Sequence, residues 1–198
     1  MKQVNLEIQL SKLDSLPNPK ASLEQYATPS DVAAYLVYRA LSEGDIKGKE
    51  VADLGCGNGI FAIGVSLMGA GKVYAIDKDG AAISTAMRNA QKLGVEIEFK
   101  EGDVSSFTKK VDTVMMNPPF GSQKRDADLP FIEKALEISK VFYILLNYKA
   151  GDFLERIVEG RGKIMWSERI EIPIPHTHEF HRKEVERIPA RMAKVKVW

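Results

Sequence analysis

The sequence contains a single cysteine, Cys56, among 198 residues. An internal disulfide framework is therefore excluded, and such sparing use of cysteine is typical of a reducing compartment, so we expect a cytoplasmic protein. An excess of one charge is also lacking, because 28 basic and 27 acidic residues leave a formal net charge of +1. A basic coat for nucleic acid is thus excluded, and any contact with nucleic acid must come from a local patch.

Long apolar runs, internal repeats and low-complexity segments are missing as well. No stretch approaches the roughly 20 apolar residues that a membrane-spanning helix requires. Histidine is scarce: three histidines lie together around Glu179, in a segment that begins with prolines. Structural zinc sites usually draw their ligands from two separated pairs, and no second pair with matching spacing is present, so the sequence predicts no metal site.

Apolar runs with helical and strand periodicity alternate along the chain. The length suits a single α/β domain over residues 1–198, in which 1–20 form an N-terminal extension with Leu6, Leu10 and Leu13 at helical spacing. Thr28 is placed to cap the next helix, which Pro29 would begin. The expected helices are 29–42, 60–68, 79–93, 129–139 and 152–159, and the expected strands are 49–54, 72–77, 95–100, 111–116, 140–147, 163–173 and 190–197.

The alternation of strands with helices implies a parallel sheet with right-handed crossovers. No clear helix separates the last two expected strands, 163–173 and 190–197, which predicts an antiparallel hairpin at one edge of the sheet. We therefore expect an α/β fold of the Rossmann-like type, with a seven-stranded, mostly parallel sheet and a C-terminal antiparallel hairpin.

A glycine-rich turn, residues 55–59, follows the first expected strand. Its glycines permit positive φ and a close approach of the backbone to a ligand, and the helix beyond offers free N–H groups to an anion. A phosphate-binding P-loop is excluded, because Ile60 stands where Lys and Ser or Thr would have to follow the last glycine. Ile60 also replaces the third glycine of a dinucleotide fingerprint, which weakens that interpretation. The remaining candidate is S-adenosylmethionine, whose carboxylate and adenosine would lie along this turn.

Acidic residues end the next two expected strands. Asp77 lies about 20 residues beyond the glycines, where nucleotide-binding folds place the acid that accepts the ribose hydroxyls. Asp103 follows the strand 95–100 and could receive the adenine amine of the cofactor. Each acid taken alone is more typical of a solvated strand end than of a ligand contact. Together they mark the edge at which open α/β sheets bind ligands.

The tetrapeptide Asn117-Pro118-Pro119-Phe120 follows the apolar strand 111–116. The exocyclic amine of a nucleobase is a weak nucleophile, because its lone pair is delocalised into the ring. The Asn117 carboxamide oxygen and the Pro118 carbonyl could accept hydrogen bonds from this NH2, which favours a pyramidal nitrogen whose lone pair faces an electrophile. Phe120 could stack on an extruded base. The tetrapeptide therefore predicts methyl transfer to an amine, although Pro-Pro before Gly121 is also compatible with an ordinary turn.

From about residue 23 to its end, the chain resembles the methyltransferase-like protein 5 group, the small-subunit ribosomal RNA adenine-N6 methyltransferases, in a prokaryotic-type version. These are class I enzymes that use S-adenosylmethionine. The segments that carry the resemblance are Leu23-Glu24-Gln25-Tyr26 with Thr28, Ala52-Asp53-Leu54-Gly55-Cys56-Gly57, Met68-Gly69-Ala70-Gly71, Arg88-Asn89-Ala90, Met116-Asn117-Pro118-Pro119-Phe120-Gly121 and Phe180-His181-Arg182-Lys183.

The resemblance, taken with these motifs, implies a set of site residues. The expected catalytic residues are Asn117, Pro118, Pro119 and Phe120, and the expected cofactor-binding residues are Gln25, Thr28, Asp53, Gly55, Gly57, Asn58, Ile60, Asp77, Asp103, Val104 and Asn117. Candidate contacts to RNA phosphates are Lys124, Arg125, His181, Arg182 and Lys183, for which a plain solvated loop is the alternative.

Eukaryotic members of this group work with a small zinc-binding activator subunit that adds a strand at the sheet edge. In this chain the expected edge is the strand 95–100, where Glu96, Glu98 and Lys100 face one way, and charges on an edge usually guard it against pairing. The need for an activator therefore stays open. The resemblance also departs after the fifth strand, where eukaryotic members carry a His-Lys pair and this chain has Asn147-Tyr148-Lys149.

The Asn-Pro-Pro-Phe motif also serves other amine methyltransferases. Some methylate the glutamine amide of release factors or ribosomal proteins, and others methylate N2 of guanine in RNA, because each substrate presents a similar NH2 group. Phe120 rather than tyrosine favours nucleic acid. The alternative of another class is a non-catalytic module that binds RNA or a partner, against which the intact motif and the intact cofactor acids argue.

Overall fold

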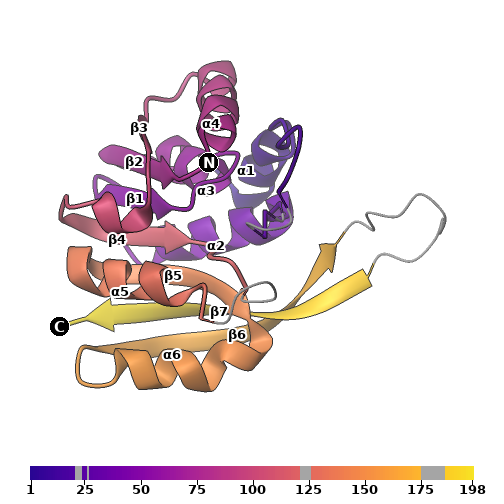
Figure 1. Ribbon diagram of the computed structural model, residues 1–198. Coiled ribbons are helices and arrows are strands. Elements are labelled where there is room, and N and C mark those ends of the chain that lie inside the picture. Colours follow the sequence, from indigo (N-terminus) through magenta and orange to yellow (C-terminus); the bar gives the residue numbers. More distant parts are fainter. Residues whose placement is uncertain (21–23, 26, 121–125, 175–185) are drawn as a thin grey trace.

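In the computed structural model, the chain is described over residues 1–20, 24–25, 27–120, 126–174 and 186–198. Its strands form one seven-stranded sheet in the order β3-β2-β1-β4-β5-β7-β6 (Figure 1). The strands are β1 (Glu50–Leu54), β2 (Lys72–Asp77), β3 (Glu98–Glu101), β4 (Val111–Met116), β5 (Ser139–Asn147), β6 (Gly162–Ile174) and β7 (Glu186–Val197).

The strands from β3 to β5 pair in parallel, and β7 pairs antiparallel with both β5 and β6. The predicted mostly parallel sheet with a C-terminal antiparallel hairpin is thus confirmed. The hairpin is longer than expected at both of its strands, because β6 continues to Ile174 and β7 starts at Glu186. Beyond the body of the molecule the two strands run on together, without a helix on either side (Figure 1).

Helices cover both faces of the sheet, and each face has its own core. The buried side chains of α1 (Gln3–Leu10), α2 (Ser30–Ser42), α3 (Ile60–Leu67) and α4 (Gly80–Leu93) belong to the first core cluster. Those of α5 (Leu129–Ile138), α6 (Gly151–Val158) and the short helix η2 (Val104–Ser106) belong to the second. A further short helix, η3 (Tyr148–Ala150), follows β5 directly.

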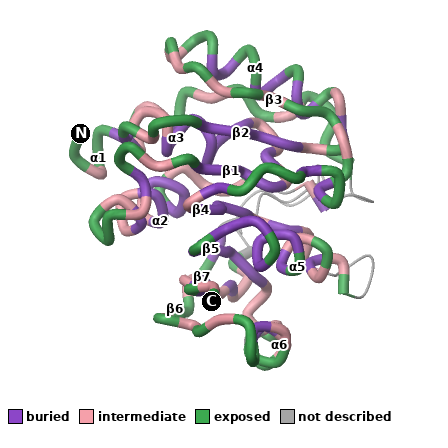
Figure 2. The backbone as a smooth tube through the Cα atoms, turned by 90° about the vertical axis from the view of Figure 1, so that its left-hand side faces the viewer, coloured by how far each residue is buried: buried purple, intermediate pink, exposed green. Residues whose placement is uncertain are grey.

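The central strands are buried on both sides, as expected for parallel strands between two helical layers. In β1 only Glu50 is exposed, and the four residues that follow are buried. Ala52 and Leu54 belong to the second core cluster, whereas Val51 belongs to the first. Figure 2 shows the same pattern in space: buried backbone runs through β1, β2, β4 and β5, and exposed residues gather at the periphery.

Strand β3 forms one edge of the sheet, as predicted, but it is shorter than the expected 95–100. Val95 does not join the ladder, because its N–H donates to the carbonyl of Ala90 at the end of α4. Val95, Ile97 and Phe99 nevertheless pack together against the first core cluster. The predicted apolar side of this segment is therefore correct, although the hydrogen-bonded strand is not as long.

Two helix starts correct the predictions. Thr28 does not cap α2, which begins at Ser30 after Pro29 without a capping side chain. The Thr28 hydroxyl instead accepts a hydrogen bond from Asn117 Nδ2 (2.9 Å). Asp79 was expected to be the first residue of α4. It instead caps α4 by accepting a hydrogen bond from the N–H of Ala81 (3.2 Å).

In the N-terminal extension, α1 buries Leu6 and Leu10 completely or nearly so, and Leu13 packs beside them. The helical spacing of the three leucines therefore reflects a packing face, although the helix ends at Leu10. The helices in the described part of the chain are all too short or too polar to cross a membrane.

The register of the sheet brings the predicted motifs to one place. Leu54 at the end of β1 lies beside Met116 of β4 and Ile76 of β2. The glycine turn, Asp77 and Asn117 each follow one of these residues, so they meet at the same edge, which we call the carboxyl edge. Because β1 and β4 are neighbours without being consecutive, the chain reverses direction across the sheet here. Such a reversal is the point at which open α/β sheets bind their ligands.

Candidate active site

The glycine turn combines two closed positions with one open position. Gly55, Gly57 and Gly59 all have positive φ, at 74°, 54° and 87°. A Cβ on Gly55 would lie 2.8 Å from Cε1 of Phe131, and one on Gly59 would lie 3.1 Å from Cβ of Ala86. A Cβ on Gly57 would meet no heavy atom within 4 Å. Gly55 and Gly59 thus permit close packing, whereas the backbone at Gly57 is open to a ligand.

Asp77 holds this turn in shape. Its Oδ2 accepts a hydrogen bond from the N–H of Gly57 (2.9 Å), and its Oδ1 accepts one from the N–H of Asp79 (3.0 Å). A carboxylate oxygen can accept more than one hydrogen bond, so Asp77 keeps capacity for hydroxyl donors. The acid that the sequence places at the ribose is therefore also the side chain that orients the glycine turn.

Asp53 lies inside the strand that leads to the turn and is 1 % exposed. Its Oδ2 accepts from the N–H of Ala62 in the first turn of α3 (2.9 Å), while its Oδ1 is buried without a partner among the described residues. The pKa of Asp53 is raised to about 7, mainly by burial and to a smaller extent by the nearby Asp77, against the lowering effect of the hydrogen bond from Ala62. Burial likewise raises the pKa of the Cys56 thiol, which is inconsistent with a reactive thiolate.

The N-terminal extension is tied to the turn through a buried amide. Asn89 of α4 is fully buried, and its Nδ2 donates to the carbonyls of Asp14 and Asn58, both at 3.0 Å. Its Oδ1 accepts from the N–H of Asp14 (2.8 Å). Asn58 Nδ2 also donates to the Asp14 carbonyl (3.2 Å). Asn58, predicted to bind cofactor, thus uses its side chain to join the turn to the N-terminal segment.

Gln25 contacts the same edge through Asp79. Gln25 Nε2 donates to Asp79 Oδ2 (2.8 Å), and Lys20 Nζ lies 2.9 Å from Asp79 Oδ1. Hydrogen bonds from Gln25 and Lys20 hold the pKa of the Asp79 carboxyl below its ordinary value. The segment around Gln25 is therefore fastened next to Asp77, which is the position that the resemblance implies for a cofactor contact.

Asn117 is held in one orientation by Thr28. Its Nδ2 donates to the Thr28 hydroxyl (2.9 Å), and its Oδ1 is buried without a partner among the described residues. A buried amide oxygen that accepts nothing costs free energy, of order 1–3 kcal/mol, unless a ligand supplies a donor. The arrangement therefore presents a fixed hydrogen-bond acceptor at the carboxyl edge.

The rest of the tetrapeptide is partly or fully enclosed. Pro118 is buried, and Pro119 and Phe120 are half-buried. Phe120 packs against the first core cluster, which fixes one side of the ring and leaves part of it accessible. The position is consistent with a rigid aromatic surface beside Asn117.

The remaining predicted cofactor residues lie on the same edge in different environments. Asp103 is exposed and caps η2 by accepting from the N–H of Ser105 (2.9 Å), a bond that lowers the pKa of its carboxyl. Val104 is buried in the second core cluster, and Ile60 opens α3 within the first. The exposed carboxylate of Asp103 is available to a ligand, whereas the two apolar side chains mainly support the surrounding backbone.

The five candidate RNA residues, namely Lys124, Arg125, His181, Arg182 and Lys183, lie outside the described residues. Three residues of the site were not predicted: Asp14, Asp79 and Lys20. Asp79 had a usable signal, since an aspartate followed by Gly80 and a helical pattern is a typical N-cap. Asp14 and Lys20 gave none, because the residues that bring them to the site, Asn89 and Asp79, lie 75 and 59 positions away. No group of three or more His, Cys, Asp or Glu forms a candidate metal site within the described ranges.

Comparison with known proteins agrees with this geometry. The model of the methyltransferase small domain family matches residues 27–140. An uncharacterised protein of Methanocaldococcus jannaschii is 38% identical over 98% of this chain and 94% of its own length. The rRNA N6-adenosine-methyltransferase METTL5 of Danio rerio is 32% identical over 93% of both chains. The crystal structure of a proposed RNA methyltransferase from Pyrococcus horikoshii has a TM-score of 0.91 and 40% identity, covering 100% of this chain and 98% of its own.

The family model matches more than half of the chain, and the two relatives align along nearly its whole length. The glycine turn, the strand-end acids and the Asn-Pro-Pro-Phe motif lie together at the carboxyl edge, where open α/β sheets bind their ligands. The chain therefore belongs to the methyltransferase small domain family of S-adenosylmethionine-dependent methyltransferases, in the group that includes METTL5.

Proposed function

We propose that this chain methylates N6 of an adenosine in RNA, and that the RNA is small-subunit ribosomal RNA. The observation that carries the proposal is the Asn117 oxygen, which is buried, lacks a described partner and is oriented by Thr28. A fixed acceptor of this kind suits an NH2 group that enters from outside. The zebrafish relative, which matches along 93% of this chain, supports adenosine in ribosomal RNA as the substrate.

The residues of the carboxyl edge fit the cofactor. Gly57 offers open backbone, Asp77 retains acceptor capacity beside it, and Asp53 leaves one buried oxygen without a described partner. These groups would hold the ribose and the polar tail of the cofactor, with Asp103 at the adenine and Gln25 closing from the N-terminal segment. When bound, S-adenosylmethionine supplies a methyl group that is already activated on a sulfonium.

The protein then contributes position and electrostatics. Asn117 Oδ1 and the Pro118 carbonyl accept the two hydrogens of the adenine amine, which turns its lone pair away from the ring. Phe120, fixed against the first core cluster, stacks on the extruded base and excludes water from its face. A dedicated base is not required, because the methylated amine is strongly acidic and can lose its proton to solvent after transfer.

The alternative substrates differ in what surrounds the NH2 group. A glutamine amide would use the same acceptor but has no aromatic ring to lie on Phe120. Guanine would present its N2 amine to Asn117 and could still stack on Phe120. The partly accessible ring of Phe120 beside Asn117 therefore favours a nucleobase, and the zebrafish relative favours adenine within that class.

We further propose that an activator subunit, if the protein uses one, adds a strand along β3. This strand is one of the two edges of the sheet, and its residues Glu98 and Lys100 are exposed. Glu98 is engaged by Lys72 and Lys109, so a partner would have to leave these ion pairs in place. The protein would be co-expressed with a zinc-binding partner. If co-expression raises neither the solubility of this protein nor its affinity for the cofactor, the role is contradicted.

The experiment that tests the function is methyl transfer from labelled S-adenosylmethionine to separated fractions of RNA and protein, followed by nucleoside mass spectrometry. We expect label in N6-methyladenosine of the small-subunit RNA. Label in N2-methylguanosine or in glutamine would keep the enzyme class and replace the substrate. Binding of the cofactor without turnover on any fraction would instead support a non-catalytic module.

A further inference from the structure

A cluster of two arginines and one tyrosine lies at the base of the β6–β7 hairpin. The guanidinium carbon of Arg169 in β6 is 4.7 Å from the centroid of the Tyr148 ring, and that of Arg191 in β7 is 5.2 Å away. Tyr148 is the first residue of η3, directly after β5. We call these three residues the arginine–tyrosine cluster.

The two arginines are direct partners in the antiparallel ladder between β6 and β7. Like charges that face each other across an antiparallel pair are destabilising, so such a pair needs a compensating group. Tyr148 supplies a ring face, Ser167 accepts one hydrogen bond from Arg191 (3.2 Å), and Glu171 pairs with Arg169 (3.0 Å). One carboxylate against two guanidinium groups leaves the cluster positive.

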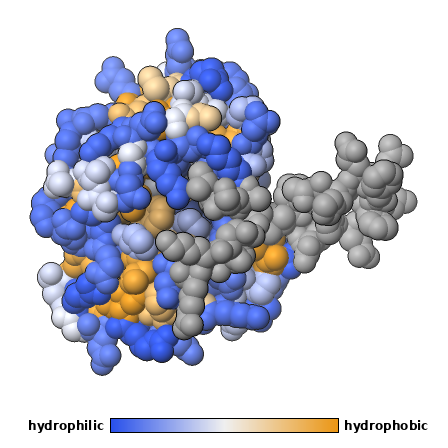
Figure 3. All heavy atoms as spheres, viewed as in Figure 1, coloured by the Kyte–Doolittle hydropathy of each residue, from blue (hydrophilic) through white to orange (hydrophobic). Residues whose placement is uncertain are grey.

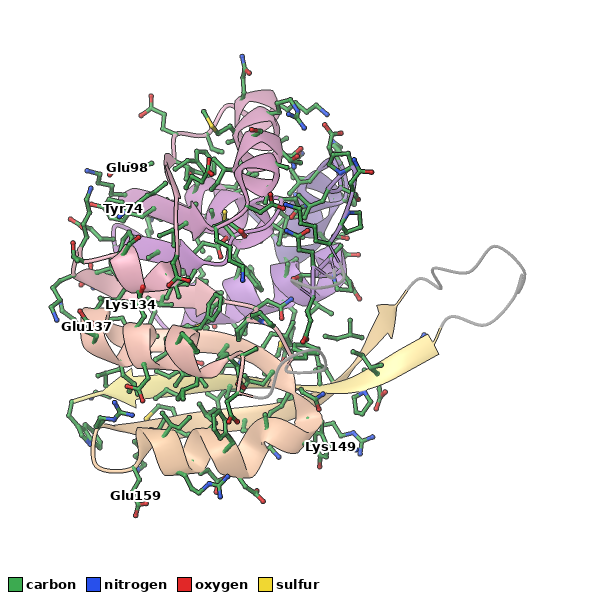
Figure 4. The ribbon with its side chains drawn as sticks, viewed as in Figure 1. Tyr74, Glu98, Lys134, Glu137, Lys149 and Glu159 are labelled. Carbon is green, nitrogen blue, oxygen red and sulfur yellow. The ribbon has the colours of Figure 1, made fainter. Side chains whose placement is uncertain are left out.

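The charge extends beyond the cluster. Arg187 lies four residues before Arg191 on β7 and therefore on the same face of the hairpin, about 13 Å further out. Lys149 follows Tyr148 and is exposed, and Figure 4 labels it on the side from which the hairpin projects. The result is a row of cations that leads from the carboxyl edge along the hairpin.

The sheet register places this row next to the candidate active site. Ile144 of β5 lies beside Met116, the residue before Asn117, and it also lies beside Ala193 of β7. Arg191 is two residues from Ala193, in the direction of the carboxyl edge. With strands about 4.8 Å apart, Arg191 is only about 10 Å sideways from the strand that carries Asn117. A single strand of RNA whose base reaches Asn117 would pass over the cluster.

A second aromatic cluster shows that this charge excess is not general. Tyr74 in β2 also has two cations over its ring, Lys72 at 5.2 Å and Lys109 at 4.4 Å. There, however, Glu98 forms ion pairs with both lysines, and a second carboxylate, that of Glu50, accepts a hydrogen bond from the Tyr74 hydroxyl (3.2 Å), so that two carboxylates face two cations. Figure 4 places Tyr74 and Glu98 on the side of the molecule opposite to Lys149. The distant cluster is neutralised within the protein, whereas the cluster near the active site keeps donors for an external anion.

We infer that the arginine–tyrosine cluster is a docking site for the phosphate backbone of the RNA substrate, next to the nucleotide that is methylated. Arginine suits this role, because its planar group binds phosphate through two hydrogen bonds. Tyr148 holds both guanidinium groups in place by cation–π contact, so that less side-chain freedom is lost when RNA binds. This inference rests on the proposed function, and it assigns a substrate contact to described residues outside the cofactor site.

The test uses the full chain and the double variant Arg169→Gln/Arg191→Gln. Binding of a short fluorescein-labelled single-stranded RNA is measured by anisotropy at several salt concentrations. Each phosphate contact to single-stranded RNA contributes about 0.7 to the slope of log affinity against log salt. We therefore expect the slope to fall by about 1.4 and the affinity at 0.1 M salt to fall by about 25-fold, with cofactor affinity unchanged.

The matched control is Lys72→Gln/Lys109→Gln, which removes the same charge from the distant Tyr74 cluster. It should leave the salt slope and the KM for RNA at their wild-type values. A further variant, Glu171→Gln, frees Arg169 from its carboxylate and should strengthen RNA binding a few-fold. If the arginines only stiffen the hairpin, this last variant will weaken binding or leave it unchanged.

The outcomes separate the inference from the proposed function. Wild-type protein that methylates small-subunit RNA, with a double variant of unchanged KM and unchanged salt slope, would overturn the docking site alone. Wild-type protein that labels no RNA overturns both. Equal losses in the double variant and in the control would show that overall charge, and not this cluster, attracts the RNA, and would likewise reject the inference.

Discussion

The polar groups at the two ends of the parallel strands differ in whether they have partners within the protein. We call the opposite edge of the sheet, where the parallel strands begin, the amino edge. There Asp112 pairs with Lys140 (2.7 Å), and Glu98 pairs with two lysines. At the carboxyl edge, Asp53 and Asn117 each keep one buried oxygen without a described partner. Figure 3 shows hydrophilic residues over much of the visible surface, with hydrophobic residues between them.

The difference shows at which edge of the sheet hydrogen-bond acceptors stay available to a ligand. Native proteins pair nearly all of their buried polar atoms, and each exception calls for a physical reason. Two of the exceptions among the described residues, Asp53 Oδ1 and Asn117 Oδ1, lie beside the glycine turn and in the Asn-Pro-Pro-Phe motif. The acids Asp112 and Glu98 at the amino edge are paired within the protein, whereas Asp53 and Asn117 at the carboxyl edge keep acceptors that a ligand could use. The predictions below test this contrast, from the largest expected effect to the smallest.

The largest effect is expected for Asn117→Ala. Removal of one preorganised polar group at a reacting centre typically lowers kcat by 10²–10³-fold, and we expect a loss of about this size in methyl transfer to RNA. The unfolding midpoint should stay near that of the wild type, because the substitution also removes a buried oxygen without a described partner. Single-turnover kinetics with labelled cofactor give the rate. Transfer at the wild-type rate by a folded Asn117→Ala protein would disprove its catalytic role.

The second prediction concerns pH and Asp53. Burial raises the pKa of Asp53 to about 7 in the folded protein, against an ordinary value of 3.8. Between these values the folded chain holds a proton that the unfolded chain has released, so rising pH favours unfolding. The contribution is at most about 1.4 kcal/mol per pH unit and ends above the folded pKa.

Urea unfolding of cofactor-free protein from about pH 5 to pH 8 measures this effect. The free energy of unfolding of the wild type should fall relative to that of Asp53→Asn as pH rises, and the difference should level off above about pH 7. Taking the difference between the two proteins cancels the histidines and the other carboxyls. Parallel curves for the two proteins would mean that Asp53 is ionised throughout this pH range. The contrast between the two edges would then rest on Asn117 alone.

A smaller effect is expected for Thr28→Ala, which removes the acceptor of Asn117 Nδ2. Loss of one such bond costs about 1 kcal/mol, so kcat should fall about 5-fold while the KM for RNA changes little. The conservative variant Thr28→Ser keeps the hydroxyl and should retain most of the activity. If both variants are equally slow, the methyl group of Thr28 and not its hydrogen bond is what matters.

The smallest effect is expected at the amino edge. Lys140 is 80% exposed and pairs there with Asp112. Surface ion pairs contribute little to stability, so Lys140→Gln should leave the unfolding midpoint and the methyl-transfer rate at their wild-type values. A clear loss of activity in this variant would show that the amino edge takes part in function and would break the contrast.

The sequence predicted the parts of the fold that follow from local patterns. Strands β2 and β4 have the expected bounds, because each is an apolar run between clear breaks. The expected bounds failed where tertiary contacts decide. Val95 is apolar and alternates like a strand residue, yet its N–H bonds back to α4. Thr28 has the sequence signature of an N-cap, yet its hydroxyl serves Asn117, which is 89 positions away.

The sequence predicted those residues of the candidate site that belong to a local motif. Asn117, Asp77 and the glycine turn were identified because their chemistry is local, and the register of the sheet then brings them together. The cluster around Tyr148 could not be identified in this way. Arg169 and Arg191 both lie within the expected strands 163–173 and 190–197, but that they are ladder partners depends on the register of the hairpin, which the sequence pattern did not give.

The order of strands has a consequence for how the protein is made. β7 follows β6 in the chain but lies between β5 and β6 in the sheet, so β6 has no place to attach until β7 has been synthesised. A nascent chain can therefore complete the five parallel strands, which carry the glycine turn and Asn117, before it has a hairpin. During translation, the capacity to hold the cofactor would thus precede the capacity to hold RNA, and a chain released early could bind the first without engaging the second.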